Sequence, residues 1–219
     1  MSQHTLTLLR FTYKKLKEKL TVSDSKKLFH EQFPYVIPGL YKRIVDEMLV
    51  ELNLLNHQNE FIQDQLFCVG LTETFKELTK GYKPEEHLSL LFDSLCNSSH
   101  FESSKIREIS QNALKEYKEK SLEEISNLLK EKSKTNLYPS RILNLGIYLI
   151  ITNASDLNNI KDSKIIEIIS DIAGKLSLPV NKIEKDIGIY KSSIIKMDQA
   201  KELLEESKTK DKKMKKDSK

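Results

Sequence analysis

The segment Tyr41-Lys-Arg-Ile-Val-Asp-Glu-Met-Leu-Val-Glu-Leu-Asn-Leu-Leu55 has the pattern of an amphipathic helix. Its apolar residues recur every three or four positions, so a helix would place them on one face against a core. They are Ile44, Val45, Met48, Leu49, Leu52 and Leu55. Lys42 precedes Asp46 by four positions, and Arg43 stands in the same relation to Glu47. Side chains at this spacing are neighbours on a helix, and we expect two ion pairs of about 0.2–0.5 kcal/mol each.

Similar helical periods occupy most of residues 21–178. Only 6 Gly and 5 Pro occur among 219 residues, too few for a fold of strands and tight turns. We expect Ser23 or Asp24 to cap the first helix, and Ser121 with Glu124 to form a capping box. The sequence therefore predicts an all-α, compact multi-helix domain. After a first helix that ends near residue 32, the expected helices are 38–56, 64–80, 84–97, 105–118, 122–132, 139–151 and 163–176.

Residues 179–207 are predicted to form a long C-terminal helix. Its apolar positions alternate steps of four and three, which is the 3.5-residue period of a coiled-coil seam. The seam is Ile183, Ile187, Tyr190, Ile194, Met197, Lys201 and Leu204, with Lys201 as its polar member. Such a helix either projects toward a partner or packs back on the body. If it projects, truncation after Val180 should leave a body that still melts cooperatively.

The net charge of +4 is unevenly distributed along the chain. Residues 208–219 hold seven Lys and two Asp (+5), and residues 1–20 hold five basic residues and one acidic residue (+4), which leaves −5 for the rest. An acidic body argues against a nucleic-acid-binding domain, which concentrates positive charge on its folded part. The Lys-rich end lacks an apolar period and is predicted to be a disordered basic tail, which either keeps the chain soluble or approaches an anionic membrane.

Residues 1–20 form a basic amphipathic N-terminal extension. Its pattern suits a membrane-surface helix or a targeting segment, and equally a helix packed on the body or translation from an upstream start codon. No apolar run reaches the roughly 20 residues that a membrane span needs. The two cysteines, Cys68 and Cys96, stand in apolar surroundings without a CxxC pattern, so we expect small buried side chains in a reducing compartment.

No catalytic or metal-binding constellation stands out in the sequence. The five histidines form no HExxH motif and no i, i+4 pair, and GxGxxG, GxxxxGK[ST] and GxSxG are absent. Adjacent acidic pairs such as Asp46 with Glu47 point away from each other on a helix. We therefore expect no enzyme activity, no metal and no cofactor.

Five separated segments, in this order, carry a family resemblance: Thr21–Lys26, Tyr41–Leu55, Phe67–Tyr82, Tyr138–Ile147 and Asp186–Ser192. Together they resemble the thylakoid formation protein family, also described as the photosystem II biogenesis factor of cyanobacteria and plastids. Members of that family are described as ending in a coiled coil, which favours a projecting C-terminal helix. Several motifs in the right order are far more specific than any one of them.

The resemblance implies a non-enzymatic factor in the biogenesis of photosynthetic thylakoid membranes. It implies a role in photosystem II assembly or repair, and partners that include photosystem II assembly components and a membrane protease of the FtsH type. It further implies a protein on the cytoplasmic or stromal side, either soluble or peripheral on the thylakoid membrane.

Six charged side chains are our candidate partner-binding residues, although a simple surface-and-core role explains them equally well: Lys42, Arg43, Asp46, Glu47, Glu51 and Arg141. Two other functions stay open. A nucleic-acid-associated protein acting through its basic ends would bind DNA or RNA with steep salt dependence. An unrecognised all-α enzyme would have a deep pocket with titratable groups of shifted pKa.

Overall fold

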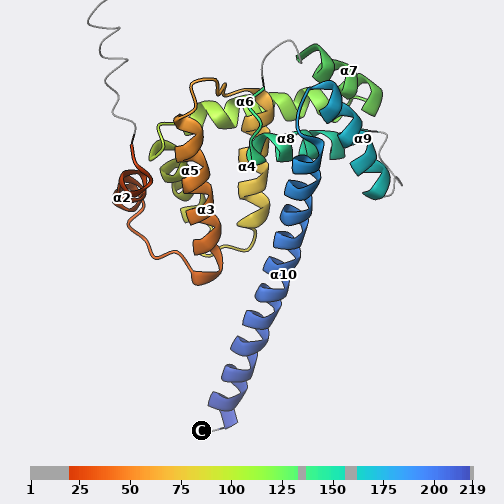
Figure 1. The fold of residues 1–219 in the computed structure, drawn as a ribbon. Coiled ribbons are helices and arrows are strands. Elements are labelled where there is room, and N and C mark those ends of the chain that lie inside the picture. The colour runs from red at the N-terminus through yellow and green to blue at the C-terminus, as the bar shows by residue number, and fades with distance from the viewer. Residues whose placement is uncertain (1–19, 133–136, 156–161, 218–219) are drawn as a thin grey trace, which may run out of the picture.

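The computed structural model describes residues 20–132, 137–155 and 162–217, and every regular element within these ranges is a helix. The prediction of an all-α fold is confirmed. Most of the helices pack into one body, from which the last helix extends (Figure 1). Apart from Leu20, the predicted N-terminal extension lies outside the described residues. The helices are α2 (Val22–Gln32), α3 (Gly39–Asn56), α4 (Gln65–Leu78), α5 (His87–Asn97), α6 (Ser103–Lys118), α7 (Leu122–Lys132), α8 (Arg141–Thr152), α9 (Asp162–Lys175) and α10 (Val180–Asp217).

Side-chain caps fix where several helices begin. The capping box of Ser121 and Glu124 forms as predicted, with the Ser121 backbone N–H donating to the Glu124 carboxylate at 2.7 Å. The cap of α2 is Thr21 and not Ser23 or Asp24. Asp24 instead occupies the third helical position, where its carboxylate accepts from the Thr21 backbone N–H at 3.0 Å. The capping side chain therefore lies one turn before the carboxylate that completes the box.

Helix α4 runs through the centre of the body and contacts α6, α8 and α10 (Figure 1). Its crossing with α8 is unusually close, because Gly70 and Gly146 bring the two backbones together. A Cβ atom added at Gly146 would overlap the Leu66 carbonyl oxygen, and one added at Gly70 would overlap the Ile142 carbonyl oxygen. Glycine is required at both positions for the backbones to approach this closely.

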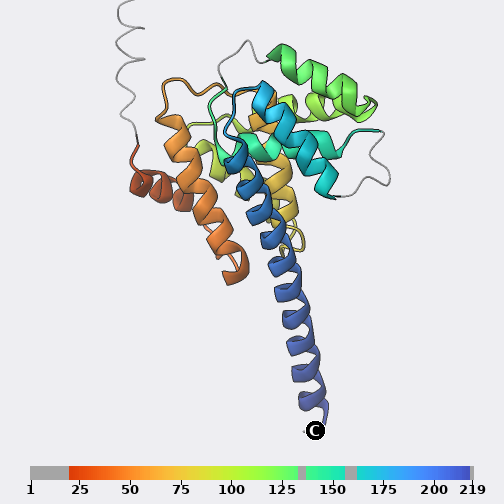
Figure 2. The ribbon, with the colours of Figure 1, turned by 45° about the vertical axis from the view of Figure 1, so that its right-hand side comes forward.

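Helix α10 packs against the body along its first half and leaves the body along its second half (Figure 2). The seam residues Ile183, Ile187, Tyr190 and Met197 are all at most 7% exposed, and Ile194 packs on the same core. Further along, Leu203 and Leu204 are 67% and 49% exposed. The seam thus packs on the body in the first half of α10, and the second half projects from it. Whether the projecting half meets a partner stays a prediction.

The boundary predicted at 178/179 therefore does not separate the body from an appended helix, because the first half of α10 belongs to the core. The helix also continues to Asp217, ten residues beyond its predicted end at residue 207, and so includes most of the predicted disordered tail. The many Lys residues of this extension suit a helix, since Lys is a good helix former. Residues 218–219 lie outside the described part of the chain.

The apolar stripe of α3 faces the core as predicted, with Val45, Met48, Leu49, Leu52 and Leu55 buried. Cys68 and Cys96 are free thiols and fully buried, as expected. Over the described ranges, the structure contains no helix that combines the length and the apolar character of a membrane span.

Candidate functional site

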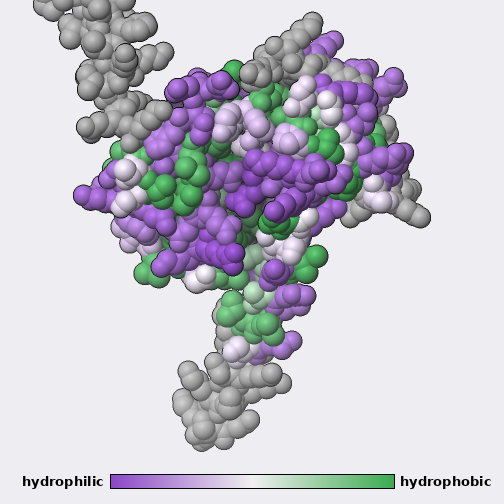
Figure 3. Space-filling view, in the orientation of Figure 1, coloured by the Kyte–Doolittle hydropathy of each residue, from purple (hydrophilic) through white to green (hydrophobic). Residues whose placement is uncertain are grey.

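All six predicted partner-binding residues line one open groove of about 880 Å³. Helix α3 supplies most of its wall, while α2, α8 and α10 contribute Lys26, Arg141 and Ile189. Hydrophilic side chains form a broad band across this face of the molecule, between α3 and the upper part of α10 (Figure 3). The sequence separates Arg141 from α3 by about 90 positions, and the fold brings them together. The lining residues are Lys26, Gly39, Lys42, Arg43, Asp46, Glu47, Val50, Glu51, Leu54, Arg141 and Ile189.

The charges in the groove form a chain of ion pairs. Arg43 pairs with Glu47 at 2.8 Å, as the spacing predicts. Arg141 then bridges from α8 to Glu47 at 3.7 Å and to Glu51 at 3.0 Å. This chain connects the exposed rim of the groove to its inner end.

The expected pair between Lys42 and Asp46 does not form. The Asp46 carboxylate instead binds the ammonium group of Lys26 on α2 at 3.0 Å. Exposed ion pairs are weak, so the pair expected within α3 has little advantage over one with a lysine of another helix. Lys42 therefore remains exposed on the rim, with Arg43 beside it.

Glu51 is the structural anchor of the groove. Its carboxylate accepts hydrogen bonds from the Arg141 side chain at 3.0 Å and from the Ile142 backbone N–H at 3.1 Å. It thereby binds the positive N-terminal end of α8, where a negative group is favourable. Burial nevertheless raises the pKa of Glu51, and the nearby Arg141 only partly offsets this effect. We conclude that Glu51 and Arg141 join α3 to α8, which leaves the exposed cations as the accessible part of the site.

A second buried polar pair lies behind this anchor and was missed from the sequence. The Asn144 side-chain amide of α8 donates to the Asp186 carboxylate of α10 at 2.7 Å, and both residues are buried. A small cavity of about 50 Å³ lies beside Asp186 and Glu51. The Asn144–Asp186 bond fixes α10 to α8 and so places Ile189 at the edge of the groove. No sequence signal pairs two polar residues 42 positions apart.

Removal of the Glu51 anchor has a larger expected effect than removal of an exposed member of the same chain. Glu51→Ala should lower the free energy of unfolding by about 1–3 kcal/mol, because the Ile142 N–H loses its acceptor and the Arg141 guanidinium keeps only its longer pair with Glu47. Arg43→Ala should change it by less than about 0.5 kcal/mol, since the Arg43 side chain is 88% exposed. Urea unfolding of the two variants tests this, and equal losses would contradict the assignment of Glu51 as the anchor.

The raised pKa of Glu51 also predicts a pH dependence. A carboxyl group whose pKa is higher in the folded state stabilises the fold below its unfolded pKa and loses that contribution as the pH rises through the folded value. The stability of the wild type relative to Glu51→Gln should therefore decline as the pH rises from about 4, the ordinary pKa of a Glu side chain, toward neutrality. Urea unfolding of both proteins across this pH range shows whether the difference in their free energies of unfolding falls or rises with pH. A relative stability that grows with pH would mean that pairing with Arg141 outweighs burial.

The described residues show neither a metal-binding cluster nor an activated thiol. They include no group of three His, Cys, Asp or Glu side chains that could hold a metal ion. Burial raises the pKa of the Cys68 thiol to about 12 and also raises that of Cys96, which makes both thiols poor nucleophiles. The described residues thus form an all-α body with a charged surface groove and a projecting C-terminal helix.

The chain belongs to the thylakoid formation protein family. Residues 21–138 and 131–219 match that family, which confirms the resemblance found in the sequence. The chain is 78% identical over 201 residues to Protein Thf1 of Prochlorococcus marinus subsp. pastoris, with 92% of this chain and 100% of that protein covered. It is 40% identical to Protein Thf1 of Prochlorococcus marinus strain NATL1A, covering 85% of this chain and 95% of that protein.

A solved structure of Psb29 has the same fold. It superposes with a TM-score of 0.71 at 24% sequence identity, and the match covers 81% of this chain and 98% of that one. At this identity the likeness concerns the fold alone.

Proposed function

We propose that this protein is a non-catalytic factor in thylakoid membrane biogenesis that supports photosystem II assembly or repair. The observation that carries the proposal is the family match, which extends from residue 21 to residue 219. The near full-length similarity to proteins named Thf1 supports it. The protein acts from the cytoplasmic or stromal side, either in solution or on the thylakoid surface.

The protein acts by binding other proteins, including a membrane protease of the FtsH type. Two features support a binding role. The rim of the α3 groove presents Lys42 and Arg43 to solvent beside the exposed side chains of Leu54 and Ile189, which are 52% and 43% exposed. Charged groups around exposed apolar ones are typical of protein-binding surfaces. The projecting part of α10 also carries apolar side chains on its surface (Figure 3). Leu203 and Leu204 belong to this part and are exposed.

Affinity purification tests the proposal directly. The chain carries an N-terminal tag, replaces the host's own family member in cyanobacterial cells, and is purified from mildly solubilised thylakoid membranes for mass spectrometry. We expect photosystem II subunits and an FtsH-type protease to be enriched over an untagged control. Recovery of neither would contradict the proposal, and recovery of photosystem II subunits alone would remove the protease from it.

A further inference from the structure

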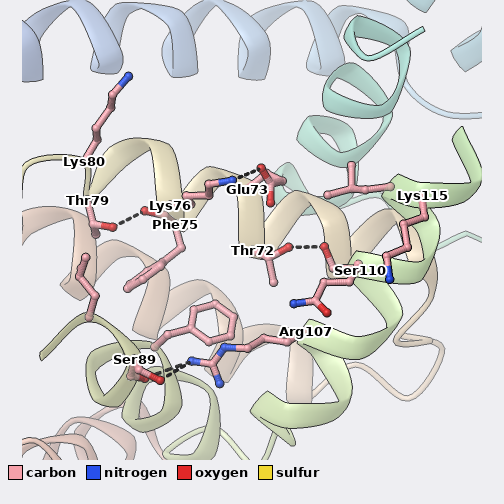
Figure 4. A pocket seen from close by; sticks show the side chains of 14 residues that line it. Thr72, Glu73, Phe75, Lys76, Thr79, Lys80, Ser89, Arg107, Ser110 and Lys115 are labelled. Atoms are coloured by element: carbon pink, nitrogen blue, oxygen red, sulfur yellow. Dashed lines mark hydrogen bonds and ion pairs between the residues drawn. The ribbon is translucent and has the colours of Figure 1, made fainter. Parts of the chain in front are cut away.

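A second groove of about 680 Å³ lies between α4, α5 and α6 (Figure 4). It shares no lining residue with the α3 groove. Neither the family resemblance nor the proposed function assigns a role to it, and the inference below does not depend on either. Its size is within the range of protein sites that enclose part of a ligand.

The floor of this groove is apolar. Phe75 of α4 and Phe92 of α5 meet edge to face with ring centroids 5.0 Å apart, and both are nearly buried. Leu88 and Leu114 pack beside them and are partly exposed. An apolar side chain laid along this floor would complete a core that the three helices leave open on one side.

Cationic and polar side chains follow both walls of the groove at helical spacing. One wall repeats every four residues at Thr72 and Lys76 of α4 and at Lys80, which lies in the turn just after α4. The α6 wall has the same period at Arg107, Gln111 and Lys115. In Figure 4, Lys80 and Lys115 lie at opposite ends of the groove, and Arg107 lies along the side between them. Four cations are therefore distributed along the groove, against one lining carboxylate, that of Glu73.

The lysines on the walls can change partners. Lys76 binds Glu73 at 3.4 Å and Lys80 binds Glu77 at 3.7 Å, but the two lysine side chains are 75% and 71% exposed. Exposed pairs of this kind contribute little and exchange readily for a better partner. Lys115 has no ion pair within the described part of the chain.

Arg107 is held in place more firmly than the lysines. It pairs with Asp93, donates to the Ser89 carbonyl oxygen at 3.1 Å, and lies over the Phe92 ring at 4.6 Å. These contacts place a fixed guanidinium group next to the apolar floor. An acidic ligand would thus meet one rigid cation and three adaptable ones.

We propose that this groove binds an acidic amphipathic helix of a protein partner. The apolar face of such a helix would cover Phe75 and Phe92, while its flanking carboxylates, spaced four residues apart, would meet the cations of the two walls. A single-chain fatty acid fits less well, because its one carboxylate would engage one of four cations and leave the others unused. The cations on both walls therefore match an acidic helix better than they match a fatty acid.

Three synthetic peptides of about 15 residues, or four helical turns, test the proposal. They share one leucine stripe and carry Glu, Gln or Lys at the remaining positions. Fluorescence anisotropy with the full chain should show the Glu peptide binding at least about tenfold more tightly than the Gln peptide, with no binding of the Lys peptide. The double variant Lys76→Glu/Lys115→Glu should lose at least about tenfold in affinity for the Glu peptide.

The matched control is Lys27→Glu/Lys105→Glu, which makes the same change in net charge at exposed lysines that do not line the groove. This control should bind the Glu peptide like the wild type. Equal affinity for the Glu and Gln peptides, absence of binding, or equal losses in both double variants would overturn the proposal. Oleate is then added to the complex with the Glu peptide. If it displaces the peptide at a concentration below the one at which the peptide itself binds half-maximally, the groove binds a lipid and the proposal is overturned as well.

Discussion

Gly146→Ala is expected to lower the free energy of unfolding by about 3 kcal/mol or more. The added Cβ would lie closer to the Leu66 carbonyl oxygen than the 3.0 Å that real Cβ atoms keep. The obstacle is backbone and not a flexible side chain, so α4 and α8 must move apart along their whole contact. Because α4 is the central helix, that movement disturbs the core on both of its sides. Urea unfolding measures the loss, and Gly70→Ala should show a similar one.

Gly188→Ala and Gly174→Ala are the matched controls. Both glycines lie inside helices, and a Cβ added at either position meets nothing within 4 Å. Alanine is the better helix former, so each control should gain up to about 1 kcal/mol. If Gly146→Ala were as stable as these controls, the close crossing of α4 and α8 would be wrong.

Truncation after Val180 is expected to abolish the cooperative fold. It removes four buried side chains of α10, and full burial of each contributes about 1.5–3 kcal/mol, or roughly 6–12 kcal/mol together. A domain of this kind has only about 5–15 kcal/mol of total stability. The truncation also leaves Asn144 without Asp186. Thermal unfolding followed by circular dichroism should lose its sigmoidal transition. This result is opposite to the one expected from a helix that projects along its whole length.

Truncation after Leu204 is the control for this experiment. It keeps Ile183 to Met197 and also Lys201, whose side chain lies against Gly81. The shortened chain should melt cooperatively and should retain the wild-type stability within about 1 kcal/mol, since removal of residues outside the core has little effect. A folded protein after the first truncation, or an unfolded one after the second, would contradict the division of α10 into two parts.

Helix periods and caps were predictable from the sequence because they depend on neighbours within a few positions. The α3 stripe and the Ser121–Glu124 box are examples. The close approach of α4 and α8 was not predictable, because it depends on two glycines 76 positions apart that meet only in the fold. The heptads of α10 fixed which face is apolar, but they do not specify whether that face meets the body or a partner.

In the candidate site, too, the sequence predicted local features but not those that depend on the fold. All six predicted side chains do lie together, because five of them share α3 and Arg141 begins the helix that packs beside it. Their roles differ in a way that charge patterns do not reveal, since Glu51 is mostly enclosed while Arg43 is exposed. The α4–α5–α6 groove was missed because its two cationic rows face each other only after folding, although the four-residue spacing of each row is visible in the sequence.

Quantitative purification of a rim variant tests most directly that this protein works by binding partners through the α3 groove. Lys42→Glu/Arg43→Glu removes the two exposed cations and leaves Glu51 and Arg141 in place, whereas Lys27→Glu/Lys105→Glu changes the net charge equally elsewhere. We predict that photosystem II subunits recovered from thylakoid membranes fall at least about fivefold with the rim variant, and match the wild type with the control. Undiminished recovery with a folded rim variant would contradict the account.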